Sequence, residues 1–150
     1  MSVLAYRSYA KENLLVITVK LEQKEKITEA VAYIRFCKGF KTDNGRSYDT
    51  KNVIALKFSL LELAALGKAF KFAAKNKGDS TFVKISKSDK MKKVTLNKTF
   101  LTVGTEEGFI GIRFTRYEME AICDDIAQMV RLANEKLWER DEEQERTAGS

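Results

Sequence analysis

The chain contains no histidine among its 150 residues. Histidine is the usual general base and the commonest metal ligand, so its absence removes Ser–His and Cys–His catalysis and most zinc sites. Only two cysteines are present, Cys37 and Cys123, and two distant thiols cannot form a structural zinc site. We therefore expect no enzyme activity, no cofactor and no metal. A magnesium-dependent nuclease built from carboxylates is the remaining catalytic alternative.

Proline is also absent, so glycine, asparagine and aspartate mark the turns. The first residues lack a long apolar segment, and no apolar run reaches the length of a membrane span. Without a signal for secretion, the two cysteines are expected to be free thiols in a cytoplasmic protein. The length suits one domain, which we place at residues 1–140.

Positive charge is in excess and unevenly distributed. The chain has 27 lysines and arginines against 21 acidic residues, a formal charge of +6. Residues 141–150 carry −3, so the first 140 residues carry +9. A basic body favours a polyanionic partner, although a basic domain without any nucleic-acid role has the same charge. The polar last segment, 141–150, predicts an acidic disordered tail.

Runs of alternating and β-branched residues predict strands separated by turns. The predicted strands cover residues 14–21, 30–40 and 53–58, and shorter ones begin at residues 81, 92, 99 and 108. Asn44-Gly45 is a strong hairpin-turn signal, because both positions tolerate positive φ.

One phrase is written twice, 56 residues apart: "IALKFSLLE" from position 54 and "IGIRFTRYE" from position 110. Each copy keeps aliphatic, cationic, phenylalanine and hydroxyl residues in register. The hydrophobic period then changes from two to 3.6 at a helix-capping box, Ser59 with Glu62 and Thr115 with Glu118. The repeat favours an internal duplication over chance convergence. It predicts an α+β fold of two strands-then-helix pseudo-repeats, with antiparallel sheets and helices packed on one side.

Alternation along the strands assigns side chains to two faces. In the strand from residue 81, Val83 and Ile85 are expected to face inward, with Phe82 and Lys84 outward. Outward cations can follow phosphates and outward rings can stack on unpaired bases, which predicts a single-strand-binding surface. The predicted nucleic-acid-binding residues, on the strands and the hairpin loop, are Tyr33, Arg35, Lys38, Phe40, Lys41, Arg46, Lys57, Phe82, Lys84, Lys93 and Arg113.

For each residue alone, an ordinary solvated sheet face, or a ring that covers an edge or a subunit contact, is the competing explanation. Recognition of double strands is less favoured, since the sequence lacks a helix-turn-helix, metal-finger spacing and a continuous basic helix. The last predicted helix carries apolar residues at helical spacing. They suit an oligomer interface or, alternatively, burial within the same subunit: Ile122, Ile126, Met129, Val130 and Leu137.

Two segments, "RSYDTKNVIALKFSLLE" and "FIGIRFTRYEMEAICDDIAQMVRLANEKLWER", resemble the Whirly family of single-stranded DNA-binding proteins. The resemblance spans roughly residues 12–140. The wider fold is shared with a transcriptional coactivator and with kinetoplastid guide-RNA-binding proteins. It implies a Whirly-like domain that binds single-stranded DNA along its sheets, with little sequence preference, and forms a homotetramer through its helices.

The family's KGKAAL motif has no counterpart before the first strand, where this chain reads "YAKENLLV". The resemblance therefore does not extend to assembly beyond the tetramer, and without an organelle signal it implies a bacterial or phage setting. Replication, recombination or repair is the implied role. The alternatives are an RNA-binding or annealing protein on the same fold, and an oligomeric scaffold that regulates transcription.

Overall fold

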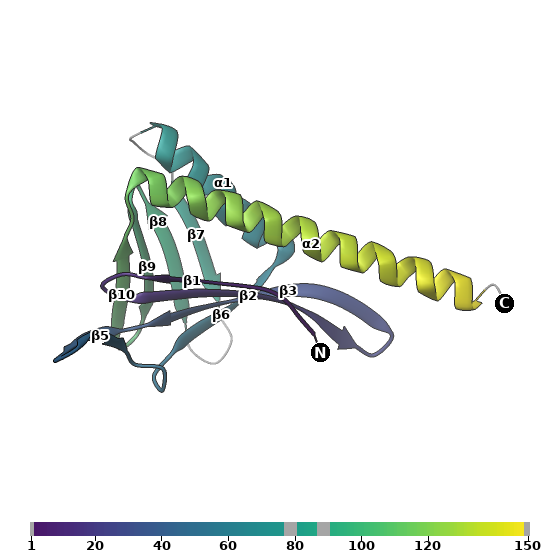
Figure 1. The fold of residues 1–150 in the computed structure, drawn as a ribbon, viewed down its shortest axis with the longest axis horizontal. Helices are drawn as coiled ribbons and strands as arrows, with labels where there is room; N and C mark the ends of the chain where they lie inside the picture. The colour runs from purple at the N-terminus through teal and green to yellow at the C-terminus, as the bar shows by residue number, and fades with distance from the viewer. Residues whose placement is uncertain (1, 77–80, 87–90, 149–150) are drawn as a thin grey trace.

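A computed structural model of the chain describes residues 2–76, 81–86 and 91–148 (Figure 1). The first half contains β1 (Ser2–Ala10), β2 (Leu14–Lys24), β3 (Ile27–Cys37), β4 (Gly39–Thr42), β5 (Gly45–Tyr48), β6 (Ile54–Ser59) and α1 (Leu60–Asn76). The second half contains β7 (Thr81–Ser86), β8 (Lys92–Asn97), β9 (Phe100–Thr105), β10 (Gly108–Arg113) and α2 (Arg116–Ala148).

The two halves share one topology. The first sheet has the order β1-β2-β3-β6, and the second has the order β10-β9-β8-β7, with every neighbouring pair antiparallel. Each sheet is a four-stranded meander that leads into a helix, and the first half also carries the β4–β5 hairpin between β3 and β6. The predicted α+β fold of two strands-then-helix units is therefore confirmed.

The two helices lie together on one side of the sheets (Figure 1). They approach closely at Gly67 of α1, where an added Cβ would lie 2.8 Å from the Ile126 Cγ2 of α2. Residues from both halves form one core, which includes the fully buried Phe58 and Phe70 and the nearly buried Phe114. Helix packing thus turns one face of each sheet inward and leaves the opposite face directed outward.

Both predicted capping boxes are present. In the first, the Ser59 amide donates to the Glu62 carboxylate at 2.9 Å, and the Glu62 amide donates to the Ser59 hydroxyl at 3.1 Å. In the second, the equivalent distances between Thr115 and Glu118 are 2.8 and 3.2 Å. These bonds satisfy amides at the helix starts that have no partner within the helix, so each strand can pass directly into a helix.

A lysine from the opposite half pairs with each capping glutamate. Lys84 of β7 donates to Glu62, and Lys11, just after β1, donates to Glu118 at 2.6 Å. Each ammonium also lies 5.9 Å from the ring of the phenylalanine just before the capping box. We call these two arrangements the lysine clasps. Because each clasp joins residues of different halves, the clasps hold the duplicated units to one another.

The clasps lower the pKa values of both glutamates. Burial alone would raise the pKa of Glu62, but hydrogen bonds from Lys84 and Ser59 outweigh it, and the pKa lies below its ordinary value. For Glu118, the hydrogen bond from Lys11 is the main cause that lowers the pKa. Both carboxylates are therefore ionised at neutral pH.

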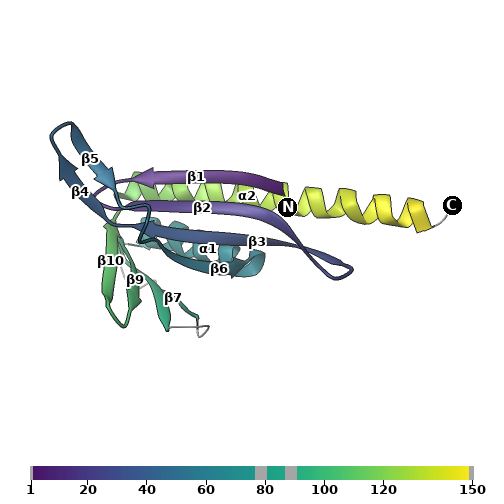
Figure 2. The ribbon, with the colours of Figure 1, turned by 90° about the horizontal axis from the view of Figure 1, so that it is seen from below.

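The prediction of a disordered tail at 141–150 is wrong for residues 141–148, because α2 continues to Ala148. No proline or glycine occurs between Gly111 and Gly149, and glutamate, arginine and glutamine favour helix. The helix is supported by side-chain pairs one turn apart, such as the Trp138 Nε1 that donates to Glu142 at 3.0 Å. Residues 149–150 lie outside the described part. Both views show the end of α2 extending past the sheets (Figures 1 and 2).

Within the described ranges, neither helix is both long enough and apolar enough to cross a membrane.

The lysine clasps should make stability sensitive to acid. The folded pKa of Glu62 and Glu118 lies below the unfolded value, so their stabilisation is present above the unfolded pKa of 4.5 and is lost as pH falls through the folded pKa. In urea denaturation between about pH 5 and pH 3, we expect Lys11→Met/Lys84→Met to lose stability less steeply than the parent. Lys136→Met removes an exposed pair on α2 and serves as the control. An unchanged slope in the double variant would contradict this role.

Candidate nucleic-acid interface

The first sheet turns a cationic surface away from the helices. Cross-strand register places Tyr33 of β3 beside Thr18 of β2 and Lys57 of β6, on the face opposite the buried Ile34. Because side chains alternate along a strand, every second residue of β2, β3 and β6 joins this face. We call it the first outer face and define it by Lys20, Glu22, Tyr33, Arg35 and Lys57.

Tyr33 is the centre of this cluster. The Lys20 Nζ lies 4.5 Å from the centroid of the Tyr33 ring, and the Arg35 guanidinium carbon lies 5.8 Å from it. The Tyr33 hydroxyl donates to Glu22, and the Lys57 Nζ lies 3.1 Å from the same carboxylate. Three predicted residues, Tyr33, Arg35 and Lys57, are thus brought together, and Lys20 joins them. Among the five residues that define this face, three are cationic and Glu22 is the acidic one.

The second sheet presents rings on its outward side. The Arg113 guanidinium carbon lies 4.7 Å from the centroid of the Phe100 ring, and this ring covers Gly111, where an added Cβ would overlap it. Phe109 lies two residues before Gly111 on the same strand face and is 71% exposed. Lys93 is exposed opposite Gly104 of the neighbouring strand. We call this surface the second outer face: Lys93, Phe100, Phe109, Gly111 and Arg113.

Sequence reasoning missed both phenylalanines of this face. Phe109 precedes Gly111 and Arg113 by steps of two, so the alternation that placed those residues outward also applies to it. Phe100 required knowledge of the strand pairing, because it faces Arg113 across the β9–β10 pair. The sequence signal was therefore present for one ring and absent for the other.

Phe82 and Lys84 do not belong to either outer face, and the prediction that their side chains point outward is wrong. Phe82 pairs with Leu96 and Lys84 with Val94, and both partners are fully buried on the helix side of the sheet. The side chains of Phe82 and Lys84 consequently lie on the inward side of β7.

The reason is a better fit of the two side chains to the core. The ring of Phe82 stacks on Phe58 at 6.1 Å, while the ammonium of Lys84 reaches the capping carboxylate of α1. A lysine can lie partly inside because its stem is apolar and its charged end finds a carboxylate. The smaller Val83 and Ile85 are left outward, 47% and 46% exposed.

The β4–β5 hairpin extends the candidate interface beyond the sheets (Figure 2). Its turn uses Gly45 at φ 125°, a conformation that favours glycine. Phe40 is about half exposed, and Lys38, at its base, and Lys41 are exposed. Arg46 is also exposed, and its guanidinium donates to the Glu12 carbonyl at 2.9 Å. All four predicted residues of this loop therefore lie on one projecting element.

One turn joins the hairpin to both sheets. Asn13, between β1 and β2, accepts a hydrogen bond from the Gly39 amide at 2.8 Å and donates to the Gly111 carbonyl at 2.7 Å. The neighbouring Glu12 carboxylate accepts from the Arg113 amide at 2.8 Å. The turn thereby fixes the base of the hairpin relative to β10. These contacts could not be predicted from local sequence patterns, because they link segments far apart in the chain.

A hollow of about 490 Å³ lies where the base of the hairpin meets the second sheet. Lys38, Lys92 and the exposed Phe109 line it, together with Asn52 and Ile54. Lys92 also donates to the Ala55 carbonyl of β6 at 2.9 Å, which ties the two sheets together here. The hollow therefore connects the hairpin with the exposed ring of the second outer face.

The prediction of an oligomer interface on α2 is wrong for its three most buried residues. Ile122, Ile126 and Met129 are at most 2% exposed within the single chain, because they pack on α1 and the sheets. Val130 and Leu137 are partly buried against the same core. The alternative reading of this apolar stripe, burial within its own subunit, is the one the structure supports.

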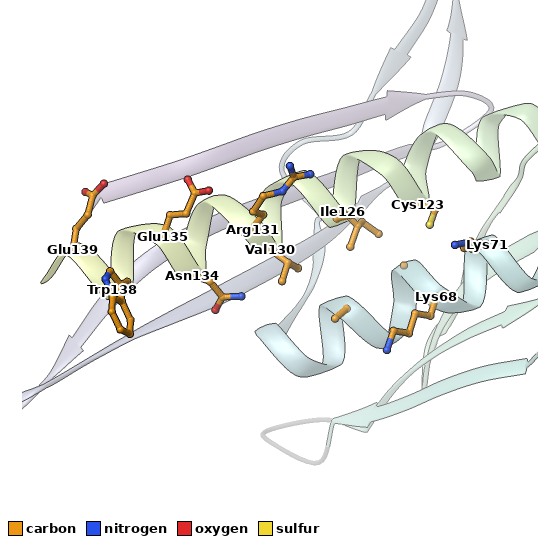
Figure 3. A pocket seen from close by; sticks show the side chains of 13 residues that line it. Lys68, Lys71, Cys123, Ile126, Val130, Arg131, Asn134, Glu135, Trp138 and Glu139 are labelled. Atoms are coloured by element: carbon orange, nitrogen blue, oxygen red, sulfur yellow. The ribbon is translucent and has the colours of Figure 1, made fainter. Parts of the chain in front are cut away.

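The open side of the helix pair instead contains a groove of about 830 Å³ between α1 and α2 (Figure 3). Lys68 and Lys71 line it from α1, whereas Glu135, Trp138 and Glu139 line it from the distal part of α2. Trp138 is largely exposed. The groove thus combines an apolar lining with two lysines from α1 and, from α2, Arg131 and two glutamates.

Among the described residues, no group of acidic side chains and cysteines is arranged to hold a metal ion. Cys37 is buried and Cys123 is partly buried, and both are free thiols, as expected. Burial is the main cause that raises the pKa of each.

No protein-family model matches the chain, and no curated protein matches it significantly in sequence. The charged and aromatic surfaces are therefore what bears on function.

Replacement of Asn13 should loosen the hairpin. In Asn13→Ala, the Gly39 amide and the Gly111 carbonyl lose their partner, at a cost of about 1–3 kcal/mol in unfolding free energy. Trypsin should also cut faster after Lys41 in the hairpin. Urea denaturation and timed proteolysis measure the two effects. The exposed Asn97→Ala should change stability by no more than about 0.5 kcal/mol, and equal behaviour of both variants would refute the role of the turn.

Proposed function

We propose that the chain is a Whirly-like single-stranded DNA-binding protein with little sequence preference, acting in DNA replication, recombination or repair. The observation that carries the proposal is the second outer face. There the exposed Phe109 lies on the same face of β10 as Arg113, whose guanidinium stacks on the Phe100 ring, and this face is directed away from the helices. Exposed rings can stack on any unpaired base, and neighbouring cations attract the backbone, so such a face binds single strands without reading sequence.

Charge on the other surfaces supports the same proposal. Lys20, Arg35 and Lys57 gather on the first outer face, and Lys38 and Lys41 are exposed on the hairpin and at its base. These cations can neutralise phosphates and release bound counterions, so affinity should fall steeply with salt. The first outer face then contributes mainly electrostatic attraction, and the second contributes mainly stacking. The proposal includes a cytoplasmic setting in a bacterium or phage-infected cell, and neither catalysis nor a cofactor.

Loss of one exposed ring should weaken binding without changing its salt dependence. Phe109→Ala removes a stacking surface worth about 1–3 kcal/mol, which is roughly a 5- to 150-fold loss of affinity. Fluorescence anisotropy with a labelled oligo-dT across a salt series measures both quantities. Tyr117→Ala is the matched control, because Tyr117 is 81% exposed and lies at the start of α2 rather than on a strand of either sheet. Equal affinities for the two variants would remove the second outer face from the proposal.

Three further arms of that experiment separate the alternatives. The parent protein should bind oligo-dT more tightly than the matching duplex, and failure to bind it in dilute buffer would overturn the proposal. A preference for oligo-U over oligo-dT would favour an RNA-binding or annealing protein. A transcription-regulating scaffold predicts that Lys57→Glu/Arg113→Glu leaves activity intact, whereas the present proposal predicts loss of binding.

We also propose that the protein is a homo-oligomer, with a tetramer as the state that the family resemblance implies. The groove between the helices supports pairing with a second copy. Its basic side is formed by Lys68 and Lys71 and its acidic side by Glu135 and Glu139, beside the exposed Trp138. A two-fold axis in this surface can place the basic side of each copy against the acidic side of the other.

Charge reversal should break this pairing and then restore it. Lys68→Glu/Lys71→Glu and Glu135→Lys/Glu139→Lys should each lower the molar mass in solution, because like charges then face one another. An equimolar mixture of the two double variants should associate again. Analytical ultracentrifugation measures the mass, and Lys24→Glu/Lys26→Glu at the β2–β3 turn is the control. A monomeric parent, or variants of unchanged mass, would refute the interface.

A further inference from the structure

Glu22 is an acidic residue of the first outer face whose carboxylate contacts Tyr33 and Lys57. It lies on β2, two residues after Lys20, and its side chain crosses β3 to reach Lys57 on β6. The carboxylate is largely covered, with 14% of the side chain exposed, whereas the side chain of Lys57 is 40% exposed. An acidic residue placed here opposes the attraction that the rest of the face would exert on a polyanion.

Both carboxylate oxygens of Glu22 have partners of the first outer face. Oε1 accepts a hydrogen bond from the Tyr33 hydroxyl, and Oε2 accepts one from the Lys57 Nζ at 3.1 Å. The hydrogen bond from Tyr33 is the main cause that lowers the pKa of Glu22, and Lys57 adds to it. One neutral and one cationic donor thus converge on a single anionic group.

We infer that Tyr33 and Lys57 form a subsite for one phosphodiester of the bound strand, and that Glu22 occupies this subsite in the free protein. A carboxylate and a phosphodiester both present anionic oxygens to hydroxyl and ammonium donors, so either group satisfies the same two donors. Lys20 and Arg35 flank the Tyr33 ring and add positive charge beside the incoming phosphate. The inference rests on the proposed function and assigns one contact within it.

Exchange of the carboxylate for a phosphate is energetically reasonable. The partner, Lys57, is substantially exposed, and lysine–carboxylate pairs of this kind are weak and screened by salt. A single phosphate must displace Glu22 by itself, while a strand is also held by the hairpin and the second outer face. The subsite therefore favours polymers over inorganic phosphate and mononucleotides.

Glu22→Gln tests the exchange directly, because glutamine keeps the shape and removes the charge. We expect its affinity for oligo-dT to rise roughly 2- to 5-fold, the strength typical of an exposed ion pair. The slope of log affinity against log salt should also steepen by about 0.7, the value for one more neutralised phosphate on a single strand.

Glu29→Gln is the matched control. Glu29 lies directly opposite Glu22 in the β2–β3 register, on the same face, and pairs with the exposed Lys24 at 3.8 Å. It loses the same charge and also frees a lysine, but Tyr33 and Lys57 keep their hydrogen bonds to Glu22, and Glu29 acts on Lys57 through its charge alone. Its slope should equal that of the parent. Matching slopes for the two variants, or weaker binding by Glu22→Gln, would overturn the inference.

A double variant identifies the freed group. In Glu22→Gln/Lys57→Gln, the gain in affinity and slope should vanish, and a gain that persists would exclude Lys57 as the phosphate ligand. Thermal melting verifies that each variant folds. If the parent protein fails to bind oligo-dT at all, the proposed function fails. If the parent binds and Glu22→Gln behaves as Glu29→Gln, only the subsite fails.

Discussion

The reciprocal lysine clasps are the contacts on which the arrangement of the two halves depends. Lys84 and Lys11 each cross to the capping glutamate of the other half, and each lies above a phenylalanine at the end of the preceding strand. In each half, the lysine ammonium, the capping carboxylate and the phenylalanine ring therefore lie together at the junction of strand and helix. Because the junctions are fixed there, the helices cover one side of the sheets and the opposite sides remain as candidate binding surfaces.

The candidate interface is composite and depends on contacts between distant segments. Asn13 and Glu12 connect the hairpin and β10, while Lys92 ties β8 to the backbone of β6. These hydrogen bonds connect the first outer face, the hairpin and the second outer face to one another. A polymer bound to one surface can therefore reach the others without a change of fold, which reduces the entropy cost of each further contact.

Local rules were sufficient for the junctions and for part of the interface. Strand alternation and capping boxes depend on neighbouring residues, so the two helix starts and the outward positions of Tyr33, Lys57 and Arg113 could be predicted. The face of β7 could not, because Phe82 and Lys84 turn inward toward partners in the other half. The burial of α2 could not be predicted either, because the spacing of its apolar residues is the same whether they cover the sheets of their own chain or another subunit.

The hairpin has one more effect on the molecule. It is inserted between the third and fourth strands of the first sheet and has no counterpart among the described residues of the second half. The two outer faces already differ in their side chains, and the hairpin adds a difference in shape. With it, a polymer that runs from the first half to the second encounters a different series of groups from one that runs the other way. If the chain binds nucleic acid as proposed, the two chemical directions of the backbone would therefore be energetically distinct on this protein.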